Sequence, residues 1–529
     1  MDWPEVSLTW QTVEYWARAT PDSEALVFGE ERKTWREFAR RVDATAKALL
    51  ELGVTRGSCV AMISMARTEF AELFMATNKV GAVWLGLSPK LSVEELRHIL
   101  EDARPSVLVT LRSYRGSDLA EAGAAMVREL EYVRHILMLG EPVEPAEPYD
   151  AFIERSRPHL DDELAGRASG TEPGDPVLLM YTSGSTGKPK GVVHTHASVL
   201  CSAKVEAERL DIRKGKRMLL HFPINHVAAD VEIGLASFYG GATVVMMDHF
   251  DPAESLKVIE REGITLVGQV PSMFLMQFAS PHFPAMDWRH VDTFIWSGST
   301  APALVPETLL RIAAKTGARV INAYGSTELA GIVTYTGPDD DAETLRQTVG
   351  RFVPPFEGRV VDEDDRTLPA GQVGELLVRG ASTMKGYLNL PDATAEAIDE
   401  ASWFHTGDLG WFDSDGRLRL TGRKSEMFIS GGENVYPREI EDILEAHPAV
   451  ALAAVVAAPD PVFQEIGRAF VMVIAGANVS VEELRNHCRA HLANYKVPKQ
   501  FDLCDSLPLL PTGKVNKLAL RERLSQPGA

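Results

Sequence analysis

The sequence predicts an α/β protein with a large N-terminal domain of mainly parallel sheets flanked by helices, and a small α+β C-terminal domain. At 529 residues the chain exceeds the usual size of a single core, so two or more domains are expected. Helix-like and strand-like segments alternate from Thr34 onward, which favours a parallel sheet between layers of helices. Near Gly422 this rhythm gives way to a glycine-rich loop followed by short helices and strands.

Hydrophobic spacing predicts the first elements of the large domain. Apolar side chains at helical spacing are expected on one face at Phe38, Val42, Ala46 and Leu49. A strand is expected at Ser58 to Ser64. Val177 to Met180 is another apolar run, and the polar stretch YTSGSTGKPKG, Tyr181 to Gly191, follows it directly. This order predicts a strand that ends in a glycine-rich turn.

The next elements are predicted from capping and turn residues. Ser92 and Glu95 have the spacing of a capping box, which predicts a helix that runs to about Ala103. The segment SVLVT at 106–110 predicts a short buried strand. EPVEPAEPYD at 141–150 is rich in Pro and Glu, so we expect it to form a surface loop.

The C-terminal elements are predicted in the same way. After the loop GRKSEMFISGGENVYP we expect a helix from about Arg438, strands at 450–456 and 468–474, and a helix capped at Ser480. We place the domains at 1–422 and 426–529. The second segment has a size that is usual for an independently folding domain.

Composition excludes several classes of protein. Hydrophobic residues make up 45% and charged residues 24%, and no stretch reaches the roughly 18 apolar residues of a membrane span. The segment MDWPEVSLTW lacks the basic start and apolar core of a secretory signal, so we expect a soluble, cytoplasmic protein with no integral membrane segment. The four cysteines form no CxxC pair, which predicts reduced thiols rather than disulfides or a zinc site.

The formal net charge of −20 disfavours a nucleic-acid partner, because nucleic-acid binding depends on many Lys and Arg residues. An anionic ligand would need local positive charge. Lys188, Lys190, Arg423 and Lys514 each lie near glycines in loop-like segments and are candidates to supply it.

The loop YTSGSTGKPKG predicts a polyphosphate site. Backbone N–H groups and hydroxyls of a glycine-rich turn converge on one point and suit phosphate oxygens. The loop does not fit the Walker pattern, because Thr182 stands where the first Gly belongs and Pro189 follows the Lys. An ordinary P-loop NTPase is therefore disfavoured, and a flexible surface turn is the structural alternative.

Further segments decide between these alternatives. They are NAYGSTE (322–328), WFHTGDLG (403–410), GRKSEMFISGGENVYPREIE (422–441) and LPLLPTGKVNK (507–517). Together with YTSGSTGKPKG, their content and order resemble the superfamily of adenylate-forming enzymes, in its acyl-CoA synthetase branch. The resemblance extends from about Trp10 to Arg523. It implies an ATP-dependent acid:CoA ligase.

The resemblance implies roles for the phosphate-binding residues. A loop over the β- and γ-phosphates would be formed by Thr182, Ser183, Gly184, Ser185, Thr186, Gly187 and Lys190. Glu328 resembles the family's Mg²⁺ ligand and Thr327 its α-phosphate contact. A hard oxygen ligand beside a polyphosphate suits Mg²⁺. The structural alternative for Glu328 is an acid at a helix N-terminus.

The nucleoside contacts are also carried over from the resemblance. The adenine would be held by Gly298, Ser299, Thr300, Asn322, Ala323 and Tyr324, with Gly325 in the same nucleotide-binding set. Asp408 is similar to the carboxylate that accepts both ribose hydroxyls, and Arg423 to the second ribose contact. A turn-forming role for Asp408 and a surface charge at Arg423 are the alternatives.

The C-terminal residues imply a mobile small domain with two tasks. Lys514 resembles the adenylation lysine, and Gly431 and Gly432 resemble the loop that lines the CoA tunnel. His226 occupies a position where the family has an aromatic residue or His at the acyl pocket and the pantetheine tunnel. Ser425 stands where the hinge residue is commonly Asp or Lys. Ser also absorbs a backbone rotation, so we place the hinge near Ser425.

Other conspicuous residues have simpler interpretations. His194 and His196 lack a third ligand at metal-binding spacing, so we expect no metal there. The acidic runs at 339–341 and 362–365 lack the calcium-loop pattern, and we expect solvated turns.

Three hypotheses for the function remain. The first is an acid:CoA ligase that uses a carboxylic acid, ATP, Mg²⁺ and coenzyme A. The second is a stand-alone adenylating enzyme that loads a carrier protein; its amino-acid-activating form usually has an Asp where this chain has Val227. The third is a nucleotide-sensing relative without catalysis, which Glu328 and Lys514 argue against. The sequence is compatible with a homodimer.

Small residues near the expected acyl pocket indicate its size. They are Ala228, Ala229, Ala323, Gly325 and Gly331. They leave room for a medium-chain or aromatic acid. Asp230 and Glu232 are expected either to contact a polar tail of that acid or to face solvent.

Overall fold

The computed structural model describes residues 3–119, 129–155, 157–182, 189–297, 301–474, 476–510 and 514–525. The chain packs into two compact units. The first consists of Met1–Val267, Gly325–Ile332 and Gly380–Glu396, and the second of Gly268–Tyr324, Val333–Arg379 and Ala397–Ala529. The predicted α/β class, with mainly parallel sheets in a large N-terminal part, is confirmed.

The first unit contains an eight-stranded sheet in the order β21-β11-β10-β4-β3-β5-β8-β9. Neighbouring strands from β10 to β9 run parallel, whereas β11 and β21 are antiparallel additions at one edge. The strands are β3 (Cys59–Ile63), β4 (Val83–Leu87), β5 (Val107–Leu111), β8 (His135–Leu139), β9 (Glu147–Pro148), β10 (Pro176–Thr182), β11 (Lys190–Thr195) and β21 (Gly386–Tyr387). The predicted strands at 58–64, 106–110 and 177–180 are among them.

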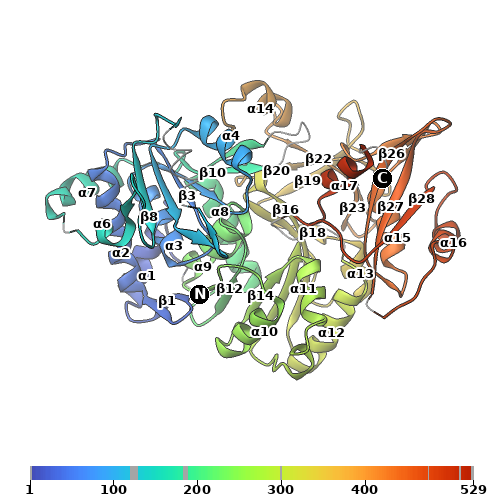
Figure 1. Ribbon diagram of the computed structural model, residues 1–529, viewed down its shortest axis with the longest axis horizontal. Coiled ribbons are helices and arrows are strands. Elements are labelled where there is room, and N and C mark those ends of the chain that lie inside the picture. The colour runs from blue at the N-terminus through green and yellow to red at the C-terminus, as the bar shows by residue number, and fades with distance from the viewer. Residues whose placement is uncertain are drawn as a thin grey trace. The chain divides into compact units, whose positions relative to one another are not determined.

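The first unit also contains the strands β12 (Arg217–Leu220), β13 (Thr243–Met246), β1 (Glu24–Phe28) and β2 (Glu31–Thr34), paired in this order. Its helices α1, α2 and α3 lie beside one another in the blue part of the ribbon (Figure 1). The helices are α1 (Gln11–Ala19), α2 (Trp35–Glu51), α3 (Thr68–Lys79), α4 (Val93–Ala103), α6 (Tyr149–Ile153), α7 (Asp161–Ser169), α8 (His196–Leu210), a π-helix (Ala228–Leu235), α9 (Ala236–Gly240), α10 (Pro252–Arg261) and α14 (Pro391–Ala397).

The capping prediction for α4 is confirmed. Ser92 accepts the backbone N–H of Glu95, and the Glu95 carboxylate accepts the backbone N–H of Ser92. The same reciprocal pair, formed by Thr34 and Glu37, starts α2. Side-chain acceptors satisfy N–H groups that a helix start leaves without partners, which fixes where both helices begin.

The prediction of a surface loop at 141–150 is wrong for its second half. Glu147 pairs with Leu137, so β9 extends the sheet, and α6 begins at Tyr149. The Tyr149 side chain is fully buried. Pro and Glu favour loops, but burial of one large aromatic ring contributes about 2 kcal/mol or more and outweighs that local preference.

The second unit combines a parallel strand pair with an antiparallel sheet. β15 (Thr293–Ser297) pairs in parallel with β16 (Arg319–Ser326), and β17 (Gly331–Tyr335) pairs antiparallel with β18 (Arg351–Phe352). The antiparallel sheet comprises β19 (Glu357–Val361), β20 (Gly374–Arg379), β22 (Phe404–Phe412) and β23 (Leu418–Arg423). Helices of this part are α11 (Pro271–Phe278), α12 (Leu304–Thr316) and α13 (Ala342–Gln347).

The C-terminal part of the second unit has its own sheet and core. Figure 1 shows α15 and α16 beside the strands β26, β27 and β28. The elements are β24 (Phe428–Ser430), β25 (Glu433–Val435), α15 (Pro437–Glu445), β26 (Val450–Asp460), β27 (Gln464–Val473), α16 (Val481–His491), β28 (Gln500–Cys504) and α17 (Lys517–Ser525). Apolar side chains from α15, α16, β26 and β27 form one buried cluster. The two predicted strands and the helix capped at Ser480 are confirmed.

Two further expectations concern cysteines and membranes. All four cysteines are free thiols, and Cys59 and Cys488 are buried. Burial raises the pKa of the Cys59 thiol to about 12, so this thiol is unreactive at neutral pH.

Among the helices of the described ranges, none is both long and apolar enough to cross a bilayer.

One buried histidine makes stability depend on pH. His221 packs against the rings of Phe222 and Phe250, with centroids 4.8 and 5.4 Å away, and within the described residues neither of its ring nitrogens has a hydrogen-bond partner. Burial lowers its pKa from 6.5 to about 3. As the pH falls below 6.5, the unfolded chain binds this proton before the folded chain does, so stability is lost.

We expect His221→Phe to remove this pH dependence. Between pH 6.5 and 4 the wild type should lose about 1.4 kcal/mol per pH unit more than the variant, the value for one proton. Thermal unfolding midpoints measured across this range test the prediction, with exposed His159→Gln as the control. A constant difference between His221→Phe and wild type at all pH values would contradict it.

Candidate active site

Strand β16 carries the predicted residues Asn322 to Gly325. The Asn322 side chain donates to the carbonyls of Leu345 and Thr348, at 3.0 and 2.9 Å, and accepts from the backbone of Ala323. The side chain of Asn322 therefore holds the end of α13 in place. Its backbone is held as well, because the Asn322 N–H donates to Thr336 Oγ1 at 2.8 Å and its carbonyl accepts from the Thr336 N–H at 2.9 Å.

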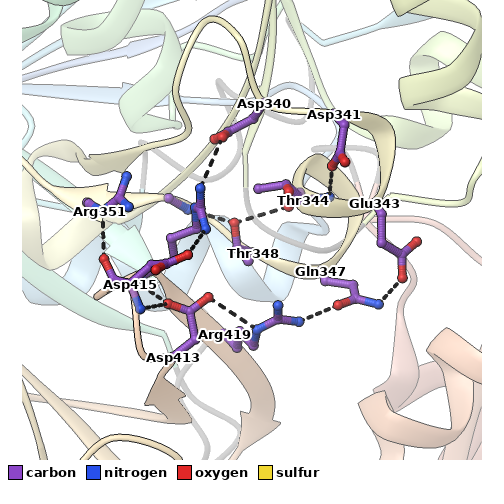
Figure 2. A network of polar contacts seen from close by, with 12 residues as sticks. Asp340, Asp341, Glu343, Thr344, Gln347, Thr348, Arg351, Asp413, Asp415 and Arg419 are labelled. Atoms are coloured by element: carbon purple, nitrogen blue, oxygen red, sulfur yellow. Dashed lines mark hydrogen bonds and ion pairs between the residues drawn. The ribbon is translucent and has the colours of Figure 1, made fainter.

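A polar network also supports α13 (Figure 2). Asp341 caps α13 by accepting the backbone N–H of Thr344 at 2.8 Å. Arg419 on β23 donates to Gln347 in the last turn of α13 and lies 3.7 Å from Asp413. The acidic run at 339–341, expected to be a solvated turn, thus also contains a helix cap. Together these contacts connect β16, α13 and the β22–β23 hairpin.

Asp408, on β22, is the centre of a compact polar group. The Tyr324 hydroxyl donates to its Oδ2 at 2.6 Å, and Arg423 Nε lies 2.9 Å from its Oδ1. Asp408 and Arg423 are cross-strand neighbours on β22 and β23, which explains why residues fifteen positions apart meet. A carboxylate has about four acceptor positions, and Tyr324 and Arg423 occupy two of them. About two positions, one on each oxygen, therefore remain for further donors.

Burial fixes the charge state of this group. The Tyr324 hydroxyl is buried and lies beside the Asp408 carboxylate, so burial and then that negative charge raise its pKa well above the ordinary value. The hydroxyl therefore remains a hydrogen-bond donor at all moderate pH values. Arg423 is more than half exposed and supplies a positive charge at the edge of the group.

The first unit holds the residues predicted for the phosphates. Thr182 and Lys190 face each other as the last pair of the β10–β11 ladder. Lys190 Nζ lies 5.0 Å from the centre of the Tyr387 ring, and the Tyr387 hydroxyl donates to Glu328 Oε1 at 3.3 Å. A positive charge, a phenol and a carboxylate are therefore neighbours at one end of this hairpin.

The backbone around Glu328 is held by contacts on both sides. His194 Nε2 donates to the Thr327 carbonyl at 2.7 Å, and the Met384 N–H donates to the Glu328 carbonyl at 2.7 Å. Gly325 approaches Gly331 so closely that a Cβ on Gly325 would lie 2.1 Å from the Gly331 carbonyl oxygen. Gly325 is thus required by the chain itself, whatever it does for a ligand.

His194 lies on β11, and His196 is the first residue of α8. Burial lowers the pKa of both His194 and His196 to about 4, so both rings are neutral at pH 7. His196 Nδ1 bonds to Thr9 at 3.1 Å. Over the described part of the chain, no group of three His, Cys, Asp or Glu side chains is arranged to hold a metal ion.

His226 lies two residues before the π-helix. Its Nδ1 accepts the backbone N–H of Ala228 at 3.1 Å, and its ring stacks on Phe222 with the ring centroids 5.9 Å apart.

Asp230 was expected either to contact a polar tail of the acid or to face solvent. The second alternative is wrong, because Asp230 is fully buried. The Trp84 indole approaches its carboxyl without completing a hydrogen bond. Burial raises the Asp230 pKa well above the ordinary value.

The C-terminal glycines form a tight turn. Gly431 and Gly432 connect β24 to β25 with φ values of 61° and 89°. Positive φ at both positions is typical of a two-residue hairpin turn that favours glycine. A Cβ on Gly431 would lie 3.2 Å from Phe463. The turn geometry accounts for both glycines without a ligand.

A partly buried ion pair of Lys517 links the Lys514 segment with the predicted hinge. The Lys514 carbonyl accepts from the Leu510 N–H at 2.7 Å. Three residues later, Lys517 Nζ lies 2.6 Å from Glu426 and 2.9 Å from Glu441. Glu426 directly follows Ser425, so this pair connects the Lys514 segment with the expected hinge.

Some predicted residues cannot be placed. Ser183, Gly184, Ser185, Thr186 and Gly187 of the expected phosphate loop lie outside the described residues. The same holds for Gly298, Ser299 and Thr300 of the expected adenine site.

Sequence reasoning missed His194 and Tyr387. His194 was considered only as a metal ligand, and its contact with the Thr327 carbonyl joins residues 133 positions apart. Tyr387 lies in the two-residue strand β21, which no periodic pattern reveals. Neither residue has a local signal for its role, because both act through contacts that only the folded chain creates.

Family models match the chain in two places. The model of the AMP-binding enzyme matches residues 13–388, and that of the AMP-binding enzyme C-terminal domain matches residues 439–514. Both matches are in the order expected from the motifs.

Relatives and solved structures match nearly the whole chain. A putative acyl-CoA synthetase, YngI, of Bacillus subtilis is 32% identical over 97% of this chain and 96% of its own. A feruloyl-CoA synthase of Amycolatopsis is 33% identical, with 96% and 97% covered. The structure of the anthranilate CoA ligase AuaEII with anthranoyl-AMP matches with a TM-score of 0.89 and 25% identity, and covers 99% of this chain and 98% of that one.

We expect His194→Ala to destabilise the first unit by about 1–3 kcal/mol, because the buried carbonyl of Thr327 loses its donor. Thr327→Ala is the matched control, since it keeps the backbone carbonyl and should change stability little. Denaturant unfolding of the two variants measures the difference. Equal stability of His194→Ala and wild type would show that this hydrogen bond does not hold the segment.

Proposed function

The chain belongs to the AMP-binding enzyme family, and on this premise we propose that it is an AMP-forming acid:CoA ligase. In the first half-reaction a carboxylate oxygen attacks the α-phosphorus of ATP, and pyrophosphate leaves. In the second, the sulfur of coenzyme A attacks the acyl carbon, and AMP leaves with the electron pair of the broken C–O bond. The products are acyl-CoA and AMP, and the thiol proton passes to solvent.

Similarity over nearly the full chain to CoA ligases carries this proposal. The relatives include a feruloyl-CoA synthase and an indoleacetate–CoA ligase, each 33% identical over 96% of this chain. Both names refer to acids with aromatic rings. Ala228 and Ala229, the first two residues of the π-helix, are buried and add little volume. We therefore assign a medium-chain or aromatic acid, larger than acetate, as the substrate.

The nucleoside is assigned to the Asp408 group. Its carboxylate has free acceptor positions for both ribose hydroxyls, while Tyr324 and Arg423 hold it in place. Charge-assisted hydrogen bonds to a preorganised carboxylate are about twice as strong as neutral ones. Gly298 to Thr300 and Asn322 to Tyr324 are proposed to contact the adenine.

The phosphates are assigned to Thr182 through Gly187, Lys190, Thr327 and Glu328. Mg²⁺ with ATP keeps several waters and takes few protein ligands, so a single carboxylate suits it better than a cage of three acids. Glu328 fits this need, because its Oε2 takes no part in the contact that its Oε1 makes with Tyr387. When bound, the ion supplies charge neutralisation, and Lys190 adds a fixed positive charge on the same hairpin.

Lys514 is proposed to neutralise the attacking carboxylate. Two unit negative charges about 4 Å apart repel by about 4 kcal/mol at an effective dielectric constant of about 20, so an approaching acid needs a cation beside the α-phosphate. The domains at 1–422 and 426–529 would rotate about the Ser425 region between the half-reactions. In the second orientation the Gly431–Gly432 turn would line the path of coenzyme A, and His226 would lie at the acyl pocket and that path.

A carrier-protein substrate is the alternative thiol acceptor. No feature of the described residues favours it. The position where amino-acid-activating relatives usually have an Asp holds Val227, whose side chain is buried. A free amino acid would therefore lack its expected counter-charge.

The proposal is tested by measuring the two half-reactions separately. Lys514→Ala should lower single-turnover formation of acyl-AMP at least a hundredfold, because it removes a transition-state charge contact. Transfer of supplied acyl-AMP to coenzyme A should remain within a fewfold of wild type. Exposed Arg489→Ala, on α16, is the control for loss of a positive charge. Equal slowing of both steps by Lys514→Ala would contradict the two-orientation mechanism.

A second prediction concerns the ribose contact. Asp408→Ala should raise the KM for ATP and weaken transition-state binding by about 2 kcal/mol or more, because charge-assisted hydrogen bonds are lost. Tyr324→Phe should have a smaller effect in the same direction, since the carboxylate remains but loses one orienting donor. Asp415→Ala, in the exposed turn of the same hairpin, is the control. Unchanged ATP kinetics in Asp408→Ala would exclude Asp408 from the nucleotide site.

A further inference from the structure

Glu206, on α8, is a buried carboxyl with an unused oxygen. Its side chain is only 1% exposed. Its Oε1 accepts the backbone N–H of Ile332 at 3.3 Å, whereas its Oε2 has no hydrogen-bond partner within the described residues. A buried polar atom without a partner costs about 1–3 kcal/mol, so this arrangement requires an explanation beyond stability.

A second buried polar group lies one helical turn earlier. Ser202 is fully buried, and its hydroxyl lies beside the Glu206 carboxyl without completing a hydrogen bond within the described residues. A Cβ placed on Gly331 would lie 2.8 Å from both Ser202 Oγ and Glu206 Oε1, and 3.2 Å from Cγ of Glu232. Side chains from α8 and the π-helix therefore converge on the bare Cα of Gly331.

The charges of this cluster favour a protonated Glu206. Burial, and then the neighbouring Glu232 carboxylate, raise the pKa of Glu206 well above its ordinary value. A protonated carboxyl accepts a hydrogen bond on one oxygen and donates one from the other. Together with the Ser202 hydroxyl, it is suited to a small group that both donates and accepts hydrogen bonds.

The position of Gly331 relates this cluster to the reaction. Gly331 follows Glu328 by three residues in the same unit, and three residues span at most about 11 Å. An aromatic or medium-chain acid is long enough to span this distance. If its carboxylate is activated near Thr327 and Glu328, its far end would thus reach the cluster.

We propose that Glu206 and Ser202 bind a hydroxyl or amino group at the end of the acyl substrate remote from its carboxylate. This inference rests on the proposed ligase function and narrows its substrate class to acids with a polar distal group. A site built for a hydrogen-bonding substituent discriminates strongly against an analogue without it, because its buried polar atoms are then left unpaired.

The test compares acids of equal size. The panel contains benzoates and cinnamates with a para hydroxyl, amino or methyl group, together with 8-hydroxyoctanoate and nonanoate. Pyrophosphate release gives kcat/KM for each acid. For at least one chain length, we expect the wild-type kcat/KM to be tenfold or more higher for the hydroxyl-substituted or the amino-substituted acid than for the methyl analogue. Comparison of the hydroxyl-substituted acid with the amino-substituted acid identifies which group is bound.

Variants connect this preference to the cluster. Glu206→Leu should reduce the polar-to-methyl ratio at least tenfold, and Ser202→Ala should reduce it by a smaller factor. Exposed Glu208→Gln, on the same helix, should leave the ratio unchanged. Thermal unfolding of each variant reports whether the fold is kept, and Ser202→Ala provides a milder change if Glu206→Leu unfolds.

The outcomes separate this inference from the proposed function. Pyrophosphate release with equal kcat/KM for polar and methyl acids at every length would overturn the inference while the ligase function stands. An unchanged ratio in a folded Glu206→Leu variant would overturn it as well. No pyrophosphate release with any acid would contradict the ligase function itself.

Discussion

The hydrogen bond from His194 to the Thr327 carbonyl fixes the segment on which most of the candidate site depends. This segment carries Thr327 and Glu328, and its later residue Gly331 lies against Glu206. Because His194 is buried and neutral, it holds the backbone without adding charge beside a polyanion. A charged donor at the same place would compete with the Mg²⁺ and the lysine that are proposed for the phosphates.

The residues that hold the backbone of the site differ from those that have capacity left to contact a ligand. Asn322 and His194 hold backbone segments through buried side chains, and Tyr324 orients a carboxylate. Asp408 keeps acceptor capacity, and Arg423 is more than half exposed. A chain with a net charge of −20 can accommodate ATP only if such positive groups are placed locally. In the Asp408 group the fixed contacts are therefore buried, and the available positive charge lies at the surface.

Patterns confined to a short stretch of sequence predicted the fold well. The capping box at Ser92 and Glu95 and the apolar periodicity of α2 depend only on neighbours along the chain, and both are present. The segment at 141–150 was mispredicted because burial of Tyr149 decides its structure, and burial depends on distant residues. The site motifs predicted roles for Asp408 and Glu328, and these roles stay predictions. No local signal indicated that Tyr387 contacts Glu328 or that Asp230 is buried.

The π-helix Ala228–Leu235 has a consequence for how this fold can change. A π-turn contains one residue more than an α-turn, and such insertions are frequent at functional sites. Deletion of one residue would restore the α-helical repeat and rotate the side chains before it by about 100° relative to those after it. Asp230 and Glu232 would then face different neighbours. A single codon gained or lost here would thus replace one set of side chains at the proposed acyl pocket with another.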